Sequence, residues 1–91
     1  MRQQKNYNEL YAFLLVAQEG NFTKAAVKLG ISQSALSRSV KLLEQHLGLQ
    51  LFTRTTRSLS LTHAGEALFV TAEQSFGSLD RQLEGLKHLR E

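Results

Sequence analysis

The stretch from Asn21 to Gly48 constrains the fold more than any other part of the chain. It contains a short helical pattern over residues 23–29, a turn at Gly30, and a second helical pattern that begins after Ser32 and ends at Leu47. Glycine readily adopts the left-handed conformation that ends many helices, and a serine hydroxyl can cap the free amides of the following helix. Two helices joined by so short a turn predict a helix-turn-helix.

The second of these helices has two chemically different faces. At ~100° per residue, four aliphatic side chains fall within a ~60° sector and five polar ones within a separate ~140° sector. The aliphatic set is Leu36, Val40, Leu43 and Leu47, and the polar set is Gln33, Ser34, Ser37, Arg38 and Lys41. We expect the aliphatic face to pack on the two preceding helices. The polar face, which contains no acid among these five residues, should remain outside.

The segments on either side complete a three-helix core with a hairpin. A first helix is predicted from Tyr7 to Glu19, where Leu10, Phe13, Leu14 and Ala17 recur at spacings of three and four. After Gly48, the alternating leucines Leu49, Leu51, Leu59 and Leu61 flank a polar, basic segment at residues 53–58. This pattern predicts a short two-stranded wing.

The last segment, from Thr62 onward, predicts one long helix. With Thr62 as its cap, the following 28 residues would span ~42 Å. Apolar residues at alternating spacings of three and four form a heptad seam: Phe69, Ala72, Phe76, Leu79, Leu83 and Leu86. Gly77 and Gly85 each cost about 1 kcal/mol relative to alanine, so we expect the helix to need a partner. We assign the seam to a homodimer interface; the alternative is ordinary core packing.

The positive charge is concentrated in residues 1–61. This part holds eight Lys or Arg against three acids, a balance of +5, whereas residues 62–91 have a balance of −2. The asymmetry favours a polyanionic partner for residues 1–61, which we define as the first domain, followed by a linker helix over residues 62–91. Such a number of bases is also ordinary for a soluble domain, so charge alone is a modest indication.

Composition excludes several classes of protein. The chain has no cysteine, and His46, His63 and His88 lie far apart, so we expect no metal site and no cofactor. No apolar run has transmembrane length, and no signal peptide is recognisable, so a cytoplasmic location is expected. No phosphate-binding loop or nucleophile–base pattern is present, and an enzyme is not predicted.

Many residue types in a fixed order carry a family resemblance. They are Phe13, Val16, Gly20-Asn21-Phe22-Thr23-Lys24-Ala25-Ala26, Leu29, Ser32-Gln33, Ser37-Arg38, Leu43-Glu44, Leu47-Gly48, Leu51-Phe52-Thr53-Arg54 and Leu61-Thr62-His63-Ala64-Gly65-Glu66. Over about Leu10 to Leu68 the chain resembles the N-terminal domain of the LysR-type bacterial transcription regulators. One departure is Ser34, where the family often has proline.

The resemblance implies a mainly α fold: a winged helix-turn-helix with a three-helix core and a short two-stranded wing, followed by a long linker and dimerisation helix. It also implies a homodimer on double-stranded DNA. In the family this helix leads to a C-terminal effector-binding domain. The chain stops at Glu91, so a small-molecule effector is expected only for that further domain.

Ten residues are predicted to contact DNA. Gln33, Ser34, Ser37 and Arg38 are expected to read bases, because a glutamine amide suits adenine and an arginine suits guanine. Thr23, Lys24, Ser32, Lys41, Arg54 and Arg57 are expected to meet phosphates, with the wing on the flanking backbone or minor groove. The competing roles are helix capping for Thr23, pairing with a nearby acid for Arg38, a solvated loop charge for Arg57, and ordinary surface positions for Gln33, Ser34 and Ser37.

We therefore predict a sequence-specific DNA-binding domain that binds an interrupted inverted-repeat operator as a dimer. The second helix of the helix-turn-helix would enter the major groove. The alternative is a non-enzymatic protein-interaction module that reuses the same scaffold.

Overall fold

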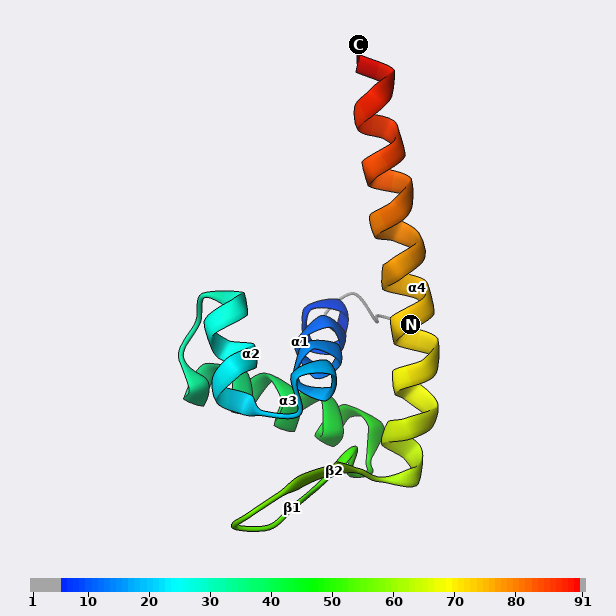
Figure 1. Cartoon of the computed structure of the whole chain (residues 1–91). Helices are drawn as coiled ribbons and strands as arrows, with labels where there is room; N and C mark the ends of the chain where they lie inside the picture. Colours follow the sequence, from blue (N-terminus) through cyan, green and yellow to red (C-terminus); the bar gives the residue numbers. More distant parts are fainter. Residues whose placement is uncertain (1–5, 91) are drawn as a thin grey trace.

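Five helical segments and one two-stranded sheet make up the computed structural model, which describes residues 6–90. The elements are α1 (Asn6–Glu19), α2 (Phe22–Leu29), α3 (Gln33–Leu47), β1 (Phe52–Arg54), β2 (Leu59–Leu61), α4 (His63–Lys87) and the 3-10 turn η1 (His88–Arg90). Helices α1–α3 and the hairpin form a head, and α4 rises beside it and extends well beyond it (Figure 1). The predicted mainly α, winged helix-turn-helix architecture with a long C-terminal helix is confirmed.

Three helices begin with a side chain that accepts a hydrogen bond from a free backbone amide. Asn21 Oδ1 accepts from the amide of Lys24 at 2.9 Å, Ser32 Oγ from that of Ala35 at 3.0 Å, and Thr62 Oγ1 from that of Gly65 at 3.0 Å. At their other ends, α2 and α3 stop at Gly30 and Gly48, whose positive φ angles of 71° and 73° suit glycine. The capping residues therefore define the turn between α2 and α3, and Asn21 rather than Thr23 caps α2.

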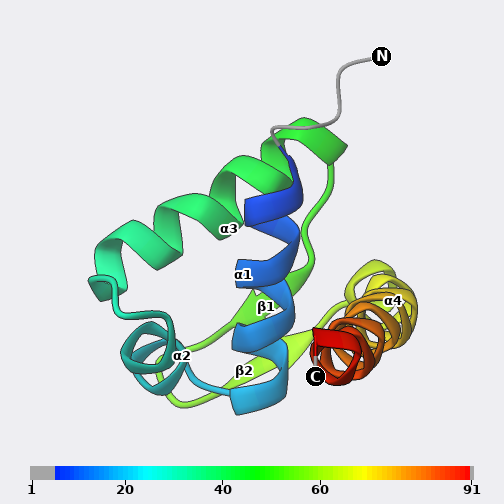
Figure 2. The ribbon, with the colours of Figure 1, turned by 90° about the horizontal axis from the view of Figure 1, so that it is seen from above.

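Helix α1 lies at the centre of the head. Its residues Ala12–Val16 are buried on all sides, so α1 is not the one-faced helix that its spacing suggests. The reason is that α2 and α3 pack on one side of α1 and α4 on the other, as the view along α4 shows (Figure 2). Phe13 and Val16 are fully buried in this position.

The aliphatic face of α3 packs on α1 as expected. Leu36, Val40 and Leu43 are at most 1% exposed and belong to one core cluster with Phe13 and Val16. The expectation that Leu47 also packs on α1 is wrong, because this residue is 46% exposed. It occupies the last turn of α3, next to the glycine cap, and does not belong to the core cluster or to the residues packed against it.

The hairpin is an antiparallel pair in which Phe52 faces Leu61 and Arg54 faces Leu59. Phe52 is buried and anchors the hairpin, with its ring centroid 5.3 Å from that of Phe13. At the tip, the amide of Thr55 donates to the carbonyl of Ser58 at 2.9 Å. The predicted wing, with its polar tip, is therefore present.

Helix α4 is joined to the hairpin through Leu51. The amide of Thr62 donates to the Leu51 carbonyl at 2.9 Å, and the Thr62 hydroxyl donates to the Gln50 carbonyl at 2.8 Å. Gly65 then passes so close to Leu51 that a β-carbon at position 65 would overlap the Leu51 carbonyl oxygen. The start of α4 therefore requires glycine at this position.

The predicted seam of α4 is divided between two environments. Its first half packs within the chain: Ala72 is buried, Phe69 packs partly buried on the core, and the Phe76 ring lies 5.3 Å from that of Tyr11 in an edge-to-face arrangement. The second half is exposed, with Leu79, Leu83 and Leu86 at 57%, 58% and 45%. Ordinary core packing thus accounts for the first half only.

The α-helix ends at Lys87 and is followed by the 3-10 turn η1, so it is shorter than the 28 residues expected. Among the helices of residues 6–90, none combines the length and apolar character needed to cross a membrane.

Gly65→Ala should lower the free energy of unfolding by about 1–3 kcal/mol, because the new methyl group would collide with backbone rather than with a flexible side chain. Urea denaturation followed by circular dichroism measures this change. The matched control is Gly85→Ala, at a position in the same helix with open space around it. This control should stabilise the helix by up to about 1 kcal/mol. Equal effects of the two substitutions would contradict the close approach at Leu51.

Candidate nucleic-acid interface

The polar face of α3 forms one continuous outer surface. Gln33, Ser34, Ser37, Arg38 and Lys41 together line a shallow, open depression. Four of these side chains are exposed, and Ser37 is half-buried. The structure therefore brings together, on a single helix, the four predicted base-reading residues and one of the predicted phosphate contacts. We call this surface the α3 face.

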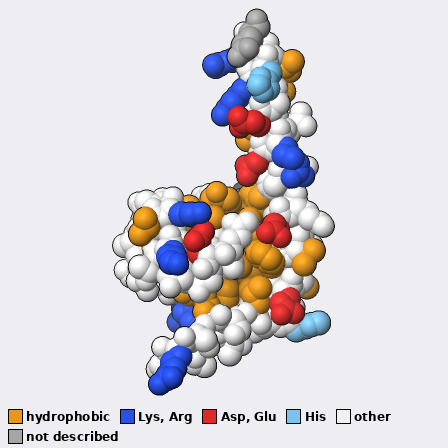
Figure 3. Space-filling view, viewed as in Figure 1, with side chains coloured by type: hydrophobic (Ala, Val, Ile, Leu, Met, Phe, Trp, Pro, Cys, Tyr) orange, Lys and Arg blue, Asp and Glu red, His pale blue; other side chains and the backbone are white. Residues whose placement is uncertain are grey.

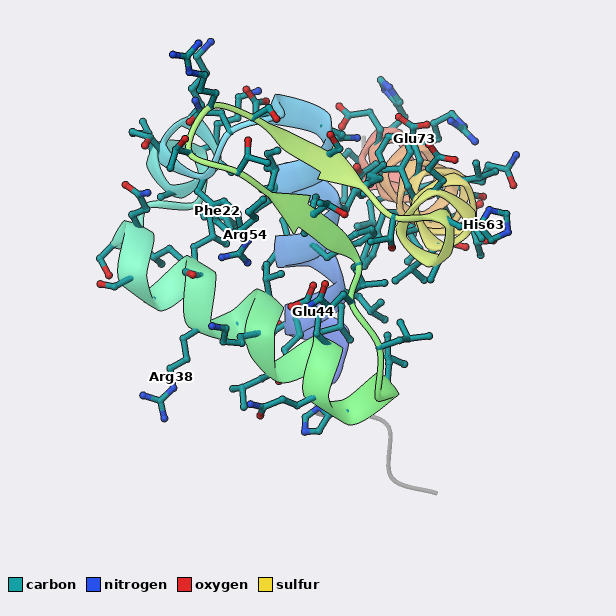
Figure 4. The ribbon with its side chains drawn as sticks, turned by 90° about the horizontal axis from the view of Figure 1, so that it is seen from below. Phe22, Arg38, Glu44, Arg54, His63 and Glu73 are labelled. Atoms are coloured by element: carbon teal, nitrogen blue, oxygen red, sulfur yellow. The ribbon has the colours of Figure 1, made fainter. Side chains whose placement is uncertain are left out.

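The bases of the α3 face are not neutralised by neighbouring acids. Among the side chains of residues 8–90, no carboxylate lies within ion-pairing distance of Arg38 or Lys41. Arg38 points away from the body of the protein, as the view from below shows (Figure 4). The competing role of Arg38, a surface arginine paired with an acid, is therefore not what this structure shows.

Thr23 and Gln33 link the two helices of the helix-turn-helix. The Thr23 hydroxyl donates to Oε1 of Gln33 at 3.1 Å, across the turn between α2 and α3. Lys24 lies exposed in the first turn of α2, with its backbone amide already bound to Asn21. Ser32 is occupied as the cap of α3, and its oxygen lies 3.5 Å from that of Ser34.

The two wing arginines have different environments. The Arg54 guanidinium lies 4.5 Å above the centre of the Phe22 ring, in a cation–π arrangement (Figure 4). Arg54 is thereby turned back toward the start of α2 and lines a groove with Thr23, Gln33 and the residues of the tip. Arg57 belongs to the exposed tip itself, and basic side chains are visible there in the space-filling view (Figure 3).

Glu44 holds the wing to α3, a role that sequence analysis did not assign. Its Oε2 accepts hydrogen bonds from the amides of Leu51 at 2.8 Å and Phe52 at 3.3 Å. Glu44 points from α3 toward the start of β1 (Figure 4). A signal was present in the sequence, because Glu44 is the only acidic residue between Glu19 and Glu66. An isolated acid in a basic segment indicates a specific partner, here two backbone amides.

The three histidines lie apart from one another in the structure. His46 shares a hydrogen bond with Glu9, 3.1 Å from Nδ1 to Oε1, and so ties the end of α3 to α1. His63 lies exposed at the start of α4 (Figure 4). Within the described part of the chain, no three His, Asp or Glu side chains are grouped in a way that could hold a metal ion.

Comparison with known proteins gives a consistent result. Residues 7–66 match the family model described as bacterial regulatory helix-turn-helix protein, lysR family. The HTH-type transcriptional regulator PtxR of Pseudomonas aeruginosa is 48% identical over 85 residues, and the regulator PgrR of Escherichia coli is 44% identical over 82 residues. These alignments cover 93% and 90% of this chain. The chain spans about a quarter, 27%, of the length of each relative.

A solved structure shares this fold over nearly the whole chain. The crystal structure of the BenM DNA-binding domain with catB site 1 DNA superimposes with a TM-score of 0.82 at 34% identity. The match covers 92% of this chain and 93% of that chain. The common fold therefore includes the wing and most of the long helix.

Glu44→Ala should free the start of the wing, because two backbone amides lose a charged acceptor. We expect a loss of about 1–3 kcal/mol in the free energy of unfolding. Hydrogen exchange at the amides of Leu51 and Phe52 should also accelerate. The control is Glu44→Gln, whose amide oxygen can still accept from Leu51 and which should retain part of the protection. Unchanged exchange at both amides in Glu44→Ala would show that the carboxylate does not hold the wing.

Proposed function

The chain belongs to the lysR family of bacterial helix-turn-helix regulators, and on this basis we propose that it is the sequence-specific DNA-binding domain of a transcription regulator. The observation that carries the proposal is the α3 face, which presents five exposed or half-buried polar residues without an acid. The relatives are named as regulators rather than enzymes. The chain would act in the cytoplasm, where bacterial DNA is found.

Shape and charge support insertion of α3 into the major groove. A helix with its side chains is about 10–12 Å across, and the major groove of B-DNA is about 12 Å wide. The back of α3 is held by Leu36, Val40 and Leu43, so α3 would meet DNA through the α3 face and not through its aliphatic side. Serine at positions 34 and 37 keeps the helix slim enough for close approach to the base edges.

The predicted contacts fall into two groups. Gln33, Ser34, Ser37 and Arg38 would read base edges, since they line the α3 face. Phosphates would be met by Lys24, Ser32, Lys41, Arg54 and Arg57. Arg54 and Arg57 belong to the hairpin, which would lie over the backbone or the adjacent minor groove.

A homodimer is proposed because one α3 face reads too few bases to be selective. Leu79, Leu83 and Leu86 are exposed on the free half of α4, where a second copy could cover them. A two-fold symmetric dimer would present two α3 faces to successive major grooves. Its operator would then be an interrupted inverted repeat.

Arg38→Ala should weaken specific binding by about 1–3 kcal/mol and relax the preference at the bases that Arg38 contacts. Gel-shift titration can measure both changes, on an operator recovered by binding-site selection with the parent chain. Tight binding of Arg38→Ala to that operator, with unchanged preference, would contradict the reading role of the α3 face.

Lys41→Ala is the matched comparison on the same face. As a phosphate contact, Lys41 should contribute to the binding of all DNA sequences alike, and its loss should reduce the slope of log K against log salt by about 1.

If selection with the parent chain recovers no two-fold symmetric motif, a protein-interaction role for this scaffold becomes the better explanation.

Leu79→Asp should convert the dimer to a monomer, because a charge would be placed within an apolar interface. Sedimentation equilibrium of parent and variant measures this shift. The control is Gln74→Asp, which adds the same charge at the heptad position opposite the seam and should remain dimeric. A parent chain that sediments as a monomer at high concentration would rule out the proposed interface.

A further inference from the structure

We propose that Thr23 is a positioning residue that holds the Gln33 amide in one orientation and so makes Gln33 prefer adenine over guanine. This role takes the place of the phosphate contact expected for Thr23 from the sequence. The inference rests on the proposed DNA-binding function and assigns a cause to part of its base preference.

The Thr23 hydroxyl is free for this task because α2 is capped by another residue. Asn21 accepts the hydrogen bond from the Lys24 amide, so the cap of α2 does not need Thr23. From the second position of α2, Thr23 reaches Oε1 of Gln33, the first residue of α3, at 3.1 Å. A β-branched side chain has few χ1 conformations, which makes Thr23 a stiff anchor for the flexible glutamine.

The orientation of the amide decides which purine Gln33 can read. With Oε1 beside Thr23, the oxygen keeps one lone pair and the nitrogen keeps two N–H donors for a base. Adenine offers an acceptor at N7 and a donor at N6, which match a glutamine amide that uses both ends. Guanine offers two acceptors, N7 and O6, and would pair only with an amide turned so that both donors face the base. An amide held in one orientation therefore discriminates between adenine and guanine better than a freely rotating amide does.

The hydrogen bond between Thr23 and Gln33 should contribute more to binding once water is excluded from the interface between α3 and DNA. Both side chains are exposed in the free chain, where water competes for the same groups. Docking of the α3 face excludes that water, and a preformed side chain loses less conformational freedom than a mobile one. The free-energy cost of immobilising a flexible side chain typically changes a binding constant by about three- to ten-fold. We expect the loss of the Thr23 hydroxyl to change DNA binding by a factor of this size.

The test compares Thr23→Val, which removes the hydroxyl but keeps the shape, with Thr23→Ser, which keeps the hydroxyl. Dissociation constants are measured for the selected operator and for versions in which each adenine is exchanged for guanine with its pair. At each tested position, the ratio of the affinity for the adenine operator to that for the guanine operator is compared. Thr23→Val should reduce this ratio by about three- to ten-fold at the positions where Gln33→Ala also loses the preference for adenine. Thr23→Ser keeps the hydroxyl but loses the branching methyl group, so it should retain most of the parent's preference and lie much closer to the parent than Thr23→Val.

A double-mutant cycle distinguishes positioning from direct contact. In the Gln33→Ala background, Thr23→Val should cause no further loss, since Thr23 acts only through Gln33. An equal loss on every sequence, or the same loss with and without Gln33, would instead identify Thr23 as a phosphate contact and overturn the inference.

A measurement without DNA separates this inference from the proposed function. In the parent chain, NMR relaxation should show the Gln33 side-chain amide to be more restricted than that of Gln45, an exposed glutamine on the same helix. In Thr23→Val the two amides should be equally mobile. Equal mobility in the parent would overturn the anchor while leaving DNA binding intact. Failure of the parent chain to select any sequence would overturn the proposed function and the base preference together.

Discussion

The packing of α3 on α1 is the interaction on which the rest of the structure depends. Leu36, Val40 and Leu43 are almost completely buried against a cluster that contains Phe13 and Val16. Each such side chain contributes about 1.5–3 kcal/mol on burial, against a total stability of about 5–15 kcal/mol for a typical domain. A rotated α3 would bury charged side chains without partners, at a higher cost than the hydrophobic gain. The hydrophobic back of α3 therefore determines which residues face outward, and the proposed reading surface follows from it.

Leu51 connects α3 to the wing and to α4. Its amide donates to Glu44 on α3, and its carbonyl accepts from Thr62 at the start of α4. Its side chain is buried, and Gly65 packs directly on its backbone. One residue thus joins the helix of the proposed reading surface to the helix of the proposed dimer interface. Because Leu51 is hydrogen-bonded to both α3 and the start of α4, the distance and angle between two α3 faces in a dimer would depend on how two α4 helices pair.

Helix α4 illustrates the limit of periodicity as evidence. The heptad seam is a property of the sequence, and its residues do lie on one side of the helix. The first half of the seam is covered by α1 within the same chain, with Phe76 against Tyr11. The second half extends past the head and leaves Leu79, Leu83 and Leu86 exposed. Periodicity identified the apolar side, but packing against the head decided how much of that side remains for a partner.

The sequence by itself determined the helical segments, their caps at Ser32 and Thr62, the hairpin and the two faces of α3, because these depend on residues close together in the chain. Only the tertiary structure decided which contacts join these elements. The bond from Thr23 to Gln33, the anchoring of the wing by Glu44, and the burial of α1 on all sides required the elements to be placed relative to one another. The physical reason is that local periodicity orients a side chain about its own helix axis. The partner that the side chain meets depends on where the other helices stop.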